Sequence, residues 1–292
     1  SSLRHLDFSL PTMPLPSFML TSVALWTMAA AIPATPQWFD NFVDHFGASD
    51  TTYKQRYYKN ETHFKGPGSP IFVILGGEGG ISPETGIFYP WITDVLAKDY
   101  GALVLEPEHR FYGESLPFGN ESFTRENLRM MSSQQALADA AHFIKKLGEA
   151  YGCTERGTSS YCPVLTIGGS YPGFLSAMMR LRYPSVVDMA YAASAPMKFY
   201  SQQVDQYAYY NRVTSSAERA VPGCADAVLA AFNGFQDVAA TWTTQETIDA
   251  LSICGAADDV DAENLVDNIV FLAEQTFAGL NMENYPPGNT TG

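Results

Sequence analysis

The sequence predicts an α/β protein with a doubly wound, mostly parallel sheet over residues 35–199 and an all-helical region over residues 200–292. Short apolar runs rich in β-branched residues alternate with segments of helical spacing up to about residue 200. The strand-like runs then stop, and Ala, Gln, Asp, Glu and Leu dominate the rest. Hydrophobic residues make up 46% of the 292 positions and charged residues only 16%, which allows a large core and excludes a disordered chain or a coiled coil.

Four strands and three helices are expected before residue 200, in an order that builds a parallel sheet by right-handed crossovers. The strands are expected at 71–75 (IFVIL), 102–105, 164–167 and 186–191. The helices are expected at 88–98, from Ser132 to about 151, and at 174–182. Ser132 is a favourable N-cap, and Gln135 follows three residues later as in a capping box. Beyond residue 200, helices are expected at 204–220, 225–241 and 262–280, as part of an inserted helical cap.

Residues 1–34 are interpreted as a signal-peptide region and are excluded from the fold. Residues 18–31 (FMLTSVALWTMAAA) form an uncharged, mostly apolar run that is short for a membrane span, and small residues and proline follow it. A buried helix is the alternative, although no polar face interrupts the run. The protein is therefore expected in the secretory pathway, in a lysosomal, vacuolar or extracellular location, with no membrane span in the mature chain.

The cysteines and asparagines agree with export. Four cysteines allow three pairings, of which the simplest is neighbour pairing, Cys153–Cys162 and Cys224–Cys254. Candidate glycosylation sites of the Asn-x-Ser/Thr type occur at Asn60, Asn120 and Asn289. No Cys/His cluster in the sequence suggests a metal site. The net charge of −14 argues against nucleic-acid binding, which needs a basic face.

The central motif is GGSYPG at residues 168–173, between an expected strand and an expected helix. A sharp turn at this place lifts the hydroxyl of Ser170 above the sheet, as in a nucleophile elbow. The helix N-terminus adds positive potential, and the backbone N–H of Tyr171 can donate to an oxyanion. The usual pattern is Gly-x-Ser-x-Gly, and here Pro172 stands at the second glycine position. An ordinary tight turn between strand and helix is the alternative for this motif alone.

A second glycine-rich segment, GGEGG at 76–80, directly follows the strand expected at 71–75. An α/β hydrolase takes its second oxyanion donor from such a loop, and the backbone N–H of Gly77 or Glu78 is the candidate. The Glu78 side chain is a candidate partner for the α-amine of a peptide substrate. A phosphate cradle is the alternative, but no Gly-Lys-Ser/Thr follows, and Glu78 would repel a phosphate.

Three motifs in this order and spacing resemble the prolyl carboxypeptidase family of serine peptidases, which includes dipeptidyl peptidase II and thymus-specific serine protease: LGGEGG (75–80), EHRFYGES (108–115) and GGSYPG (168–173). The resemblance covers about residues 37–280, including WFDNFVDHF (38–46) and ASAP (193–196). It implies an α/β-hydrolase fold with an inserted helical cap and cleavage of peptides near a terminus, after proline or a similar small residue. It also implies no metal or organic cofactor. The expected partners are peptide substrates and, in the full-length protein, a second copy of the chain.

The histidines limit the catalytic interpretation. An α/β hydrolase orders its triad as Ser, then Asp or Glu, then His, but all histidines here precede Ser170: His5, His45, His63, His109 and His142. The resemblance places the triad Asp and His beyond the cap, so these residues are expected to form an incomplete domain that is inactive as a peptidase alone. His109 could be a base brought close in space, but the resemblance implies a structural or pocket-lining part for its segment, and this role is expected. Two alternatives stay open, an esterase- or lipase-like α/β hydrolase and a catalytically inactive, α/β-hydrolase-like binding protein.

Overall fold

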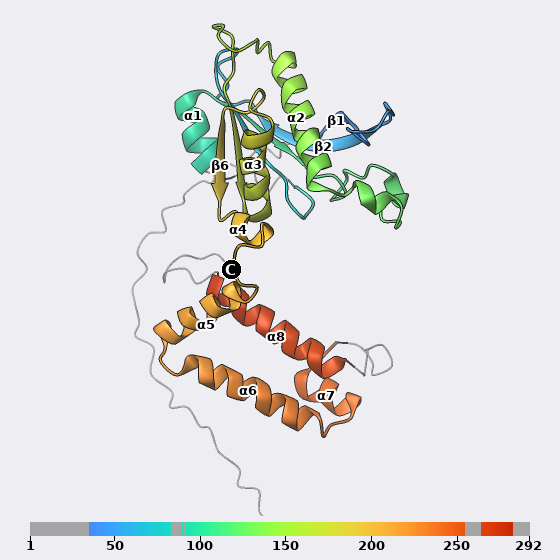
Figure 1. Ribbon diagram of the computed structural model, residues 1–292, viewed down its shortest axis with the longest axis vertical. Helices are drawn as coiled ribbons and strands as arrows, with labels where there is room; N and C mark the ends of the chain where they lie inside the picture. The colour runs from blue at the N-terminus through green and yellow to red at the C-terminus, as the bar shows by residue number, and fades with distance from the viewer. Residues whose placement is uncertain (1–34, 83–88, 90, 255–263, 283–292) are drawn as a thin grey trace, which may run out of the picture. The chain divides into compact units, whose positions relative to one another are not determined.

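The computed structural model describes residues 35–82, 89, 91–254 and 264–282, and it divides into two compact units (Figure 1). The first unit contains the described residues up to Gly168 together with Leu175–Tyr191. The second contains Gly169–Phe174 and the described residues from Ala192 onward. The expected signal-peptide region, 1–34, lies outside the described residues. None of the described helices is long and apolar enough to cross a membrane.

A six-stranded sheet forms the centre of the first unit, in the order β1-β2-β4-β3-β5-β6. Its strands are β1 Gln37–Phe42, β2 Thr52–Asn60, β3 Ile71–Ile74, β4 Leu103–Pro107, β5 Val164–Gly169 and β6 Met189–Ala193. β3 pairs in parallel with both β4 and β5, whereas β2 pairs antiparallel with β1 and β4. The expected α/β class is confirmed, and all four expected strands form. The antiparallel pair β1–β2 was not expected from the sequence.

The two faces of the sheet pack against different helices because successive strand residues point to opposite sides. On one face, Phe72, Ile74 and Val104 share a buried cluster with Ala97 of α1, Ala97–Tyr100. On the other face, the ring of Tyr57 lies 5.0 Å from that of Phe143, on α2, Ser133–Ala150. Figure 1 accordingly shows α1 and α2 on opposite sides of the sheet. β3 and β4 are buried along their whole length, as expected of strands covered on both faces.

The expected helices of the first unit form with shifted boundaries. The segment expected at 88–98 is a π-helix, Trp91–Leu96, continued by α1, and residues 88 and 90 lie outside the described residues. α2 begins after Ser132, whose hydroxyl accepts the backbone N–H of Gln135 as expected. The expected second hydrogen bond of the capping box, from the backbone N–H of Ser132 to the Gln135 side chain, does not form. The Gln135 side chain turns away to the segment after β1, where it donates to Asp44 at 2.6 Å and accepts the backbone N–H of His45.

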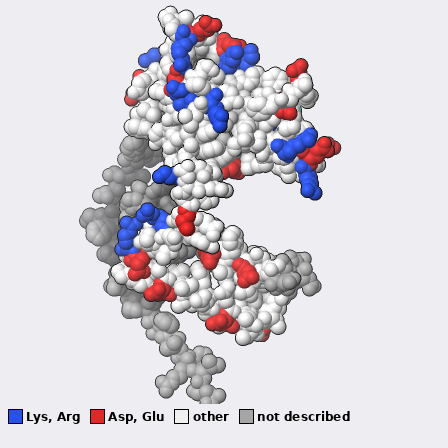
Figure 2. All heavy atoms as spheres, viewed as in Figure 1, with Lys and Arg blue, Asp and Glu red and all other residues white. Residues whose placement is uncertain are grey.

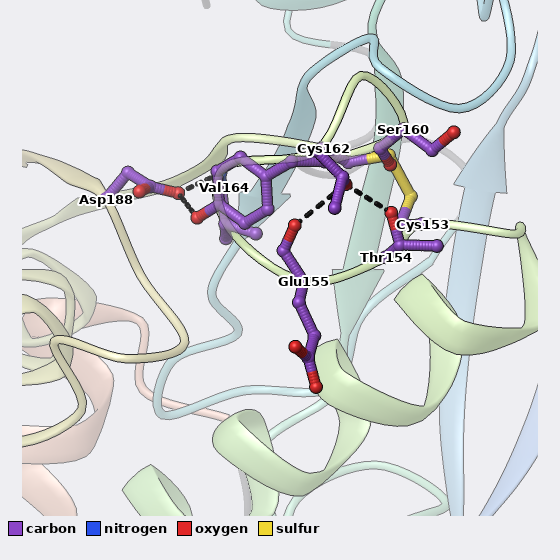
Figure 3. Close-up of a disulfide and its surroundings, with 9 residues drawn as sticks. Cys153, Thr154, Glu155, Ser160, Cys162, Val164 and Asp188 are labelled. Carbon is purple, nitrogen blue, oxygen red and sulfur yellow. Dashed lines mark hydrogen bonds between the residues drawn. A yellow bond between two sulfur atoms is a disulfide. The ribbon is translucent and has the colours of Figure 1, made fainter.

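One disulfide joins Cys153 and Cys162, and it closes a short loop between α2 and β5 (Figure 3). The carboxylate of Asp188 holds this loop against the sheet. It accepts hydrogen bonds from the Tyr161 hydroxyl at 2.6 Å and from the backbone N–H of Val164 at 2.8 Å. It also forms an ion pair with Arg156 at 2.6 Å. The disulfide loop is therefore fixed to the amino end of β5.

From Met197 onward, the described secondary-structure elements of the second unit are all helices, as expected after residue 200. It contains α4 Met197–Tyr200, α5 Ala208–Ala220, α6 Cys224–Ala239, α7 Thr244–Leu251 and α8 Leu265–Met282. α7 was not expected, although Thr243 and Glu246 form a complete capping box at its start. On the face shown in Figure 2, Lys and Arg are interspersed with Asp and Glu and form no continuous basic surface among the described residues.

The expected second disulfide is wrong, because Cys224 and Cys254 are both free thiols. Cys224 begins α6, which has 16 residues and is therefore about 24 Å long. α7 has eight residues, so even an antiparallel α7 returns the chain by only about 12 Å. The α-carbons of two cysteines must come within about 7 Å to form a disulfide. Neighbour pairing along the sequence took no account of the helix α6 that separates Cys224 from α7.

We expect alkylation of the denatured, unreduced protein to modify two cysteines, Cys224 and Cys254, because the sulfurs of Cys153 and Cys162 are bonded. Reduction should expose all four cysteines, as counted by peptide mass spectrometry. The control is the double variant Cys153→Ser, Cys162→Ser, in which reduction should add no modified site. Protection of Cys224 and Cys254 before reduction would contradict the expectation.

Candidate active site

Ser170 lies at the junction of β5 and α3, Ser170–Arg182. β5 ends at Gly169 and the helix begins at the next residue, so no loop residue separates them. Ser170 has a φ of 56°, in the left-handed region that a residue with a Cβ rarely occupies. Such a conformation costs on the order of 1–3 kcal/mol and occurs preferentially at functional sites. Ser170 is also exposed. These are the features that a nucleophile elbow requires.

A buried pair of hydroxyls fixes α3 against β5 behind this turn. The Ser176 hydroxyl donates to the carbonyl oxygen of Thr166 at 2.9 Å, and the two side-chain oxygens lie 3.0 Å apart. Both residues have no exposed surface. By contrast, a Cβ built at Gly169 would meet only Ala193 at ordinary contact distance, 3.9 Å. Steric crowding therefore does not require glycine at position 169.

Tyr171 and Phe174, at the start of α3, belong with Tyr200 to a row of aromatic rings within the second unit. The rings of Tyr171 and Phe174 stack with centroids 6.3 Å apart. Phe174 also meets Tyr200 edge to face at 5.0 Å. Tyr171 is the second residue of α3, so its backbone N–H belongs to the first turn, where the helix dipole is positive.

The glycine-rich loop 76–80 leaves the sheet from the neighbouring strand. β3 and β5 are parallel, with Ile74 opposite Ile167, so the loop and the turn at Ser170 follow the carboxyl ends of adjacent strands. Gly76 is needed for space, since a Cβ there would lie 2.8 Å from the carbonyl oxygen of Pro107. Gly77 is half-buried and Glu78 is exposed in the loop.

The carboxylate of Glu108 lies buried where this loop ends. Its Oε1 accepts the backbone N–H of Ile81 at 3.0 Å and the guanidinium of Arg56 at 2.5 Å. Its Oε2 accepts the Ser115 hydroxyl at 2.7 Å and the backbone N–H of Glu114 at 3.0 Å. The side chain has no exposed surface, so the carboxylate exchanges all its hydration for four protein donors.

Arg110 is the centre of a second buried network on the other side of the same segment. It binds Asp139 of α2 in a bidentate manner, at 2.6 and 2.7 Å. Its remaining N–H groups donate to the carbonyl oxygens of Phe42, Val43 and Met130. Asp139 also accepts from two further side chains, the Tyr53 hydroxyl at 2.9 Å and His45 at 2.7 Å. The pair therefore joins the end of β1, β2 and α2.

His109 lies between the two networks and is buried, in keeping with the structural or pocket-lining expectation. Its Nδ1 lies 2.7 Å from the carbonyl oxygen of Arg110, which can only accept, so Nδ1 carries the proton. Burial lowers the pKa of His109, and this hydrogen bond partly opposes the shift. His109 lines a small cavity of about 20 Å³ together with Gly76, Glu108, Arg110 and Asp139. That volume is enough for about one water molecule.

Glu78 contributes negative charge near His109 and Tyr112. The pKa of Tyr112 is raised mainly by burial, and the charge of Glu78 raises it further. The same charge favours the protonated form of His109. The rings of His109 and Tyr112 lie 5.4 Å apart. An exposed carboxylate at this position can attract a cationic group such as an amine.

Two of the three candidate glycosylation asparagines are among the described residues. Asn60 is half-exposed at the end of β2 and Asn120 is exposed, whereas Asn289 lies outside the described residues. The ring of His142 packs between those of Phe39 and Phe42, with its Nδ1 3.0 Å from Asn41 Oδ1. No group of three or more His, Cys, Asp or Glu residues in the described part of the chain could hold a metal ion.

Sequence reasoning missed Glu108, Asp139 and Arg56 as the residues that organise the loops. A signal for Asp139 was present. It is the single charge within ALADAA (136–141), a run with no polar face. An isolated charge in such a helix needs a buried partner of opposite charge.

Comparison with known proteins gives one family and several relatives. The family model described as serine carboxypeptidase S28 matches residues 41–289. Human lysosomal Pro-X carboxypeptidase is 33% identical over 278 residues, which are 91% of this chain and 53% of that protein. Mouse thymus-specific serine protease is 38% identical over 204 residues, 69% of this chain and 38% of that protein. The chain thus spans about half the length of the first of these relatives.

Among solved structures, a thioesterase domain from the curacin biosynthetic pathway matches with a TM-score of 0.36 and 14% sequence identity. The match covers 62% of this chain and 50% of that domain. Similarity at this level is too low to support an assignment.

Proposed function

Because the chain belongs to the serine carboxypeptidase S28 family, we propose that the whole protein is a serine exopeptidase that cleaves peptides near a terminus, after proline, with Ser170 as nucleophile. The observation that carries the proposal is the exposed Ser170 at φ 56°, directly between β5 and α3. A strained serine at the carboxyl end of a central parallel strand is the arrangement that presents a hydroxyl to substrate. The glycine-rich loop after the adjacent strand β3 supports the same assignment.

In the proposed mechanism, the Ser170 hydroxyl oxygen attacks the carbonyl carbon of the scissile bond, and its proton passes to a general base. The carbonyl oxygen becomes an oxyanion, which accepts hydrogen bonds from the backbone N–H groups of Tyr171 and Gly77. The C–N bond then breaks, the leaving amine takes the proton from the base, and an acyl-enzyme remains. Water hydrolyses this ester in the second half of the reaction.

We assign the general base to none of His45, His109 and His142. All three precede Ser170 in the sequence, and their described hydrogen bonds, to Asp139, Asn41 and a backbone carbonyl, belong to the buried networks of the first unit. In this fold the histidine follows the nucleophile in the sequence.

Glu78 is the proposed substrate-binding residue of the loop. Its exposed carboxylate would form an ion pair with the α-amine of a peptide substrate. A lysosomal or other secretory location is also proposed, since the chain contains a disulfide and the relatives include a lysosomal Pro-X carboxypeptidase.

The test uses the full-length protein and a set of short peptides that have proline or alanine before the last residue or at the second residue. We expect cleavage after proline next to one terminus, and loss of cleavage when that terminus is acetylated or amidated. A serine-directed phosphonate should label Ser170, as mapped by peptide mass spectrometry. Hydrolysis of small esters without any peptide cleavage would contradict the peptidase and favour an esterase. Binding of peptides without cleavage or labelling would favour an inactive binding protein.

A further inference from the structure

The glycine-rich loop has a fixed position at both of its ends. At the start, the backbone N–H of Leu75 donates to Ile167 at 2.9 Å and that of Gly76 donates to Pro107 at 3.2 Å. At the end, Ile81 is bound through its backbone on both sides. Its N–H donates to Glu108 at 3.0 Å and its carbonyl oxygen accepts from Arg56 at 2.8 Å. Only residues 77–80 remain between the anchors.

Glu108 and Arg56 form this second anchor as one unit. A carboxylate supplies only acceptors and a guanidinium only donors, so a single peptide residue needs both to be held at its N–H and its carbonyl oxygen. The two side chains are themselves joined at 2.5 Å, and the Glu108 side chain has no exposed surface. Arg56 lies on β2 and Glu108 directly follows β4, so this ion pair holds the end of the loop in a fixed position relative to both strands.

The turn FYG (111–113) encloses the same carboxylate. Phe111 and Gly113 both have positive φ values, 69° and 54°. A Cβ at Gly113 would lie 2.0 Å from the Glu108 carboxylate, and a Cβ at Gly80 would lie 3.1 Å from the Gly113 α-carbon. Glycine is thus required at 113 both for backbone conformation and for space. The turn fits against Glu108 and against the end of the loop together.

Three of the four residues between the anchors are glycine, so the loop has much backbone freedom that folding must restrict. An oxyanion donor accelerates a reaction only if its position is fixed before the charge develops. We propose that Glu108 and Arg56 are positioning residues that fix the loop amides at 77–78 for oxyanion binding. This inference rests on the proposed function, because it assigns a purpose to the same loop.

The test compares Glu108→Gln with Asp188→Asn in the full-length protein. Glutamine has the shape of glutamate, but its amide nitrogen cannot accept the two donors that now face one carboxylate oxygen. Asp188 is a matched control, because it also accepts a backbone N–H and an arginine, but at the amino end of β5. We expect Glu108→Gln to lower kcat about 10–100-fold with KM changed less than threefold.

A peptide boronic acid, which mimics the tetrahedral intermediate, should lose affinity by the same factor as kcat in Glu108→Gln. A product peptide, which does not, should keep its affinity. Asp188→Asn should leave the ratio of the two affinities unchanged even if it lowers the melting temperature. Equal weakening of both ligands by Glu108→Gln would mean a merely structural role and would overturn the inference.

Hydrogen exchange separates this inference from the proposed function. Amides at 76–81 should exchange at least tenfold faster in Glu108→Gln than in the wild type, and Asp188→Asn should not change them. If the wild-type protein neither cleaves peptides nor binds the boronic acid, the proposed function fails. Hydrogen exchange at 76–81 still tests whether Glu108 and Arg56 anchor the loop. Unchanged exchange at 76–81 overturns the anchoring. If Glu108→Gln does not fold, Arg56→Lys serves, because lysine keeps the charge but cannot hold Glu108 and Ile81 together.

Discussion

Replacing Ser170 by alanine is expected to lower kcat for peptide hydrolysis by the full-length protein about 10⁴–10⁶-fold. The variant keeps a Cβ at a φ of 56°, so its backbone strain is nearly that of the wild type and the fold should persist. What disappears is the oxygen that forms the acyl-enzyme. The remaining oxyanion donors and substrate contacts can support only a small residual rate.

Ser194→Ala is the matched control for this experiment. Ser194 is also an exposed serine with positive φ, 48°, and it directly follows β6. Its replacement should change kcat and KM by no more than a few-fold. Initial rates on the Pro-containing peptides, with circular dichroism to check folding, provide the measurement. A Ser170→Ala protein that retains a tenth or more of the activity would exclude Ser170 as nucleophile.

Replacing Asp139 by alanine is expected to lower the free energy of unfolding by about 3–5 kcal/mol. The Asp139 side chain is 2% exposed and that of Arg110 is fully buried, so the variant leaves a guanidinium without a counter-charge inside the protein. Three carbonyl oxygens still accept from Arg110, but they carry only partial charge. The Tyr53 hydroxyl and His45 lose their acceptor at the same time.

Asp40→Ala removes an ion pair of the same type on the surface. Asp40 lies 2.8 Å from Lys54, and the two side chains are 58% and 64% exposed. Exposed pairs of this kind contribute about 0–1 kcal/mol. Urea unfolding of both variants gives the comparison, and Asp139→Asn can replace an Asp139→Ala protein that does not fold. An equal loss of stability in the two positions would show that burial does not matter here.

The two central strands, β3 and β4, could be predicted because they are buried on both faces. β3 and β4 are nearly continuous apolar runs, which stand out in a sequence. β2 does not stand out in the sequence, because its residue Gln55 is buried through hydrogen bonds and not through apolar contact. It binds Asn41 at 2.8 Å and the carbonyl oxygen of Glu108 at 2.7 Å. Such burial depends on partners far along the chain, which the local pattern does not contain.

In the candidate site, the parts that follow predicted strands could also be predicted, and the long-range contacts could not. The turn at Ser170 and the loop at 76–80 follow strands that the pattern identifies, so their place in the sheet follows from the sequence. The anchor of the loop cannot be predicted from the sequence in this way, since Arg56 and Glu108 are 52 residues apart. A charged residue in or next to a strand is ordinarily taken as solvent-facing, and only the folded chain shows that both side chains are largely buried.

β6 is the last strand of the sheet at one side, and no described residue pairs with its outer edge. Its sequence, MAYAA, has no charged residue, and Met189 and Tyr191 are 51% and 61% exposed. Unpaired backbone groups on a short apolar edge act as a template for strands of other molecules. Wherever this edge is exposed, molecules can therefore associate through β6. For biochemical work, such association must be distinguished from a specific quaternary structure.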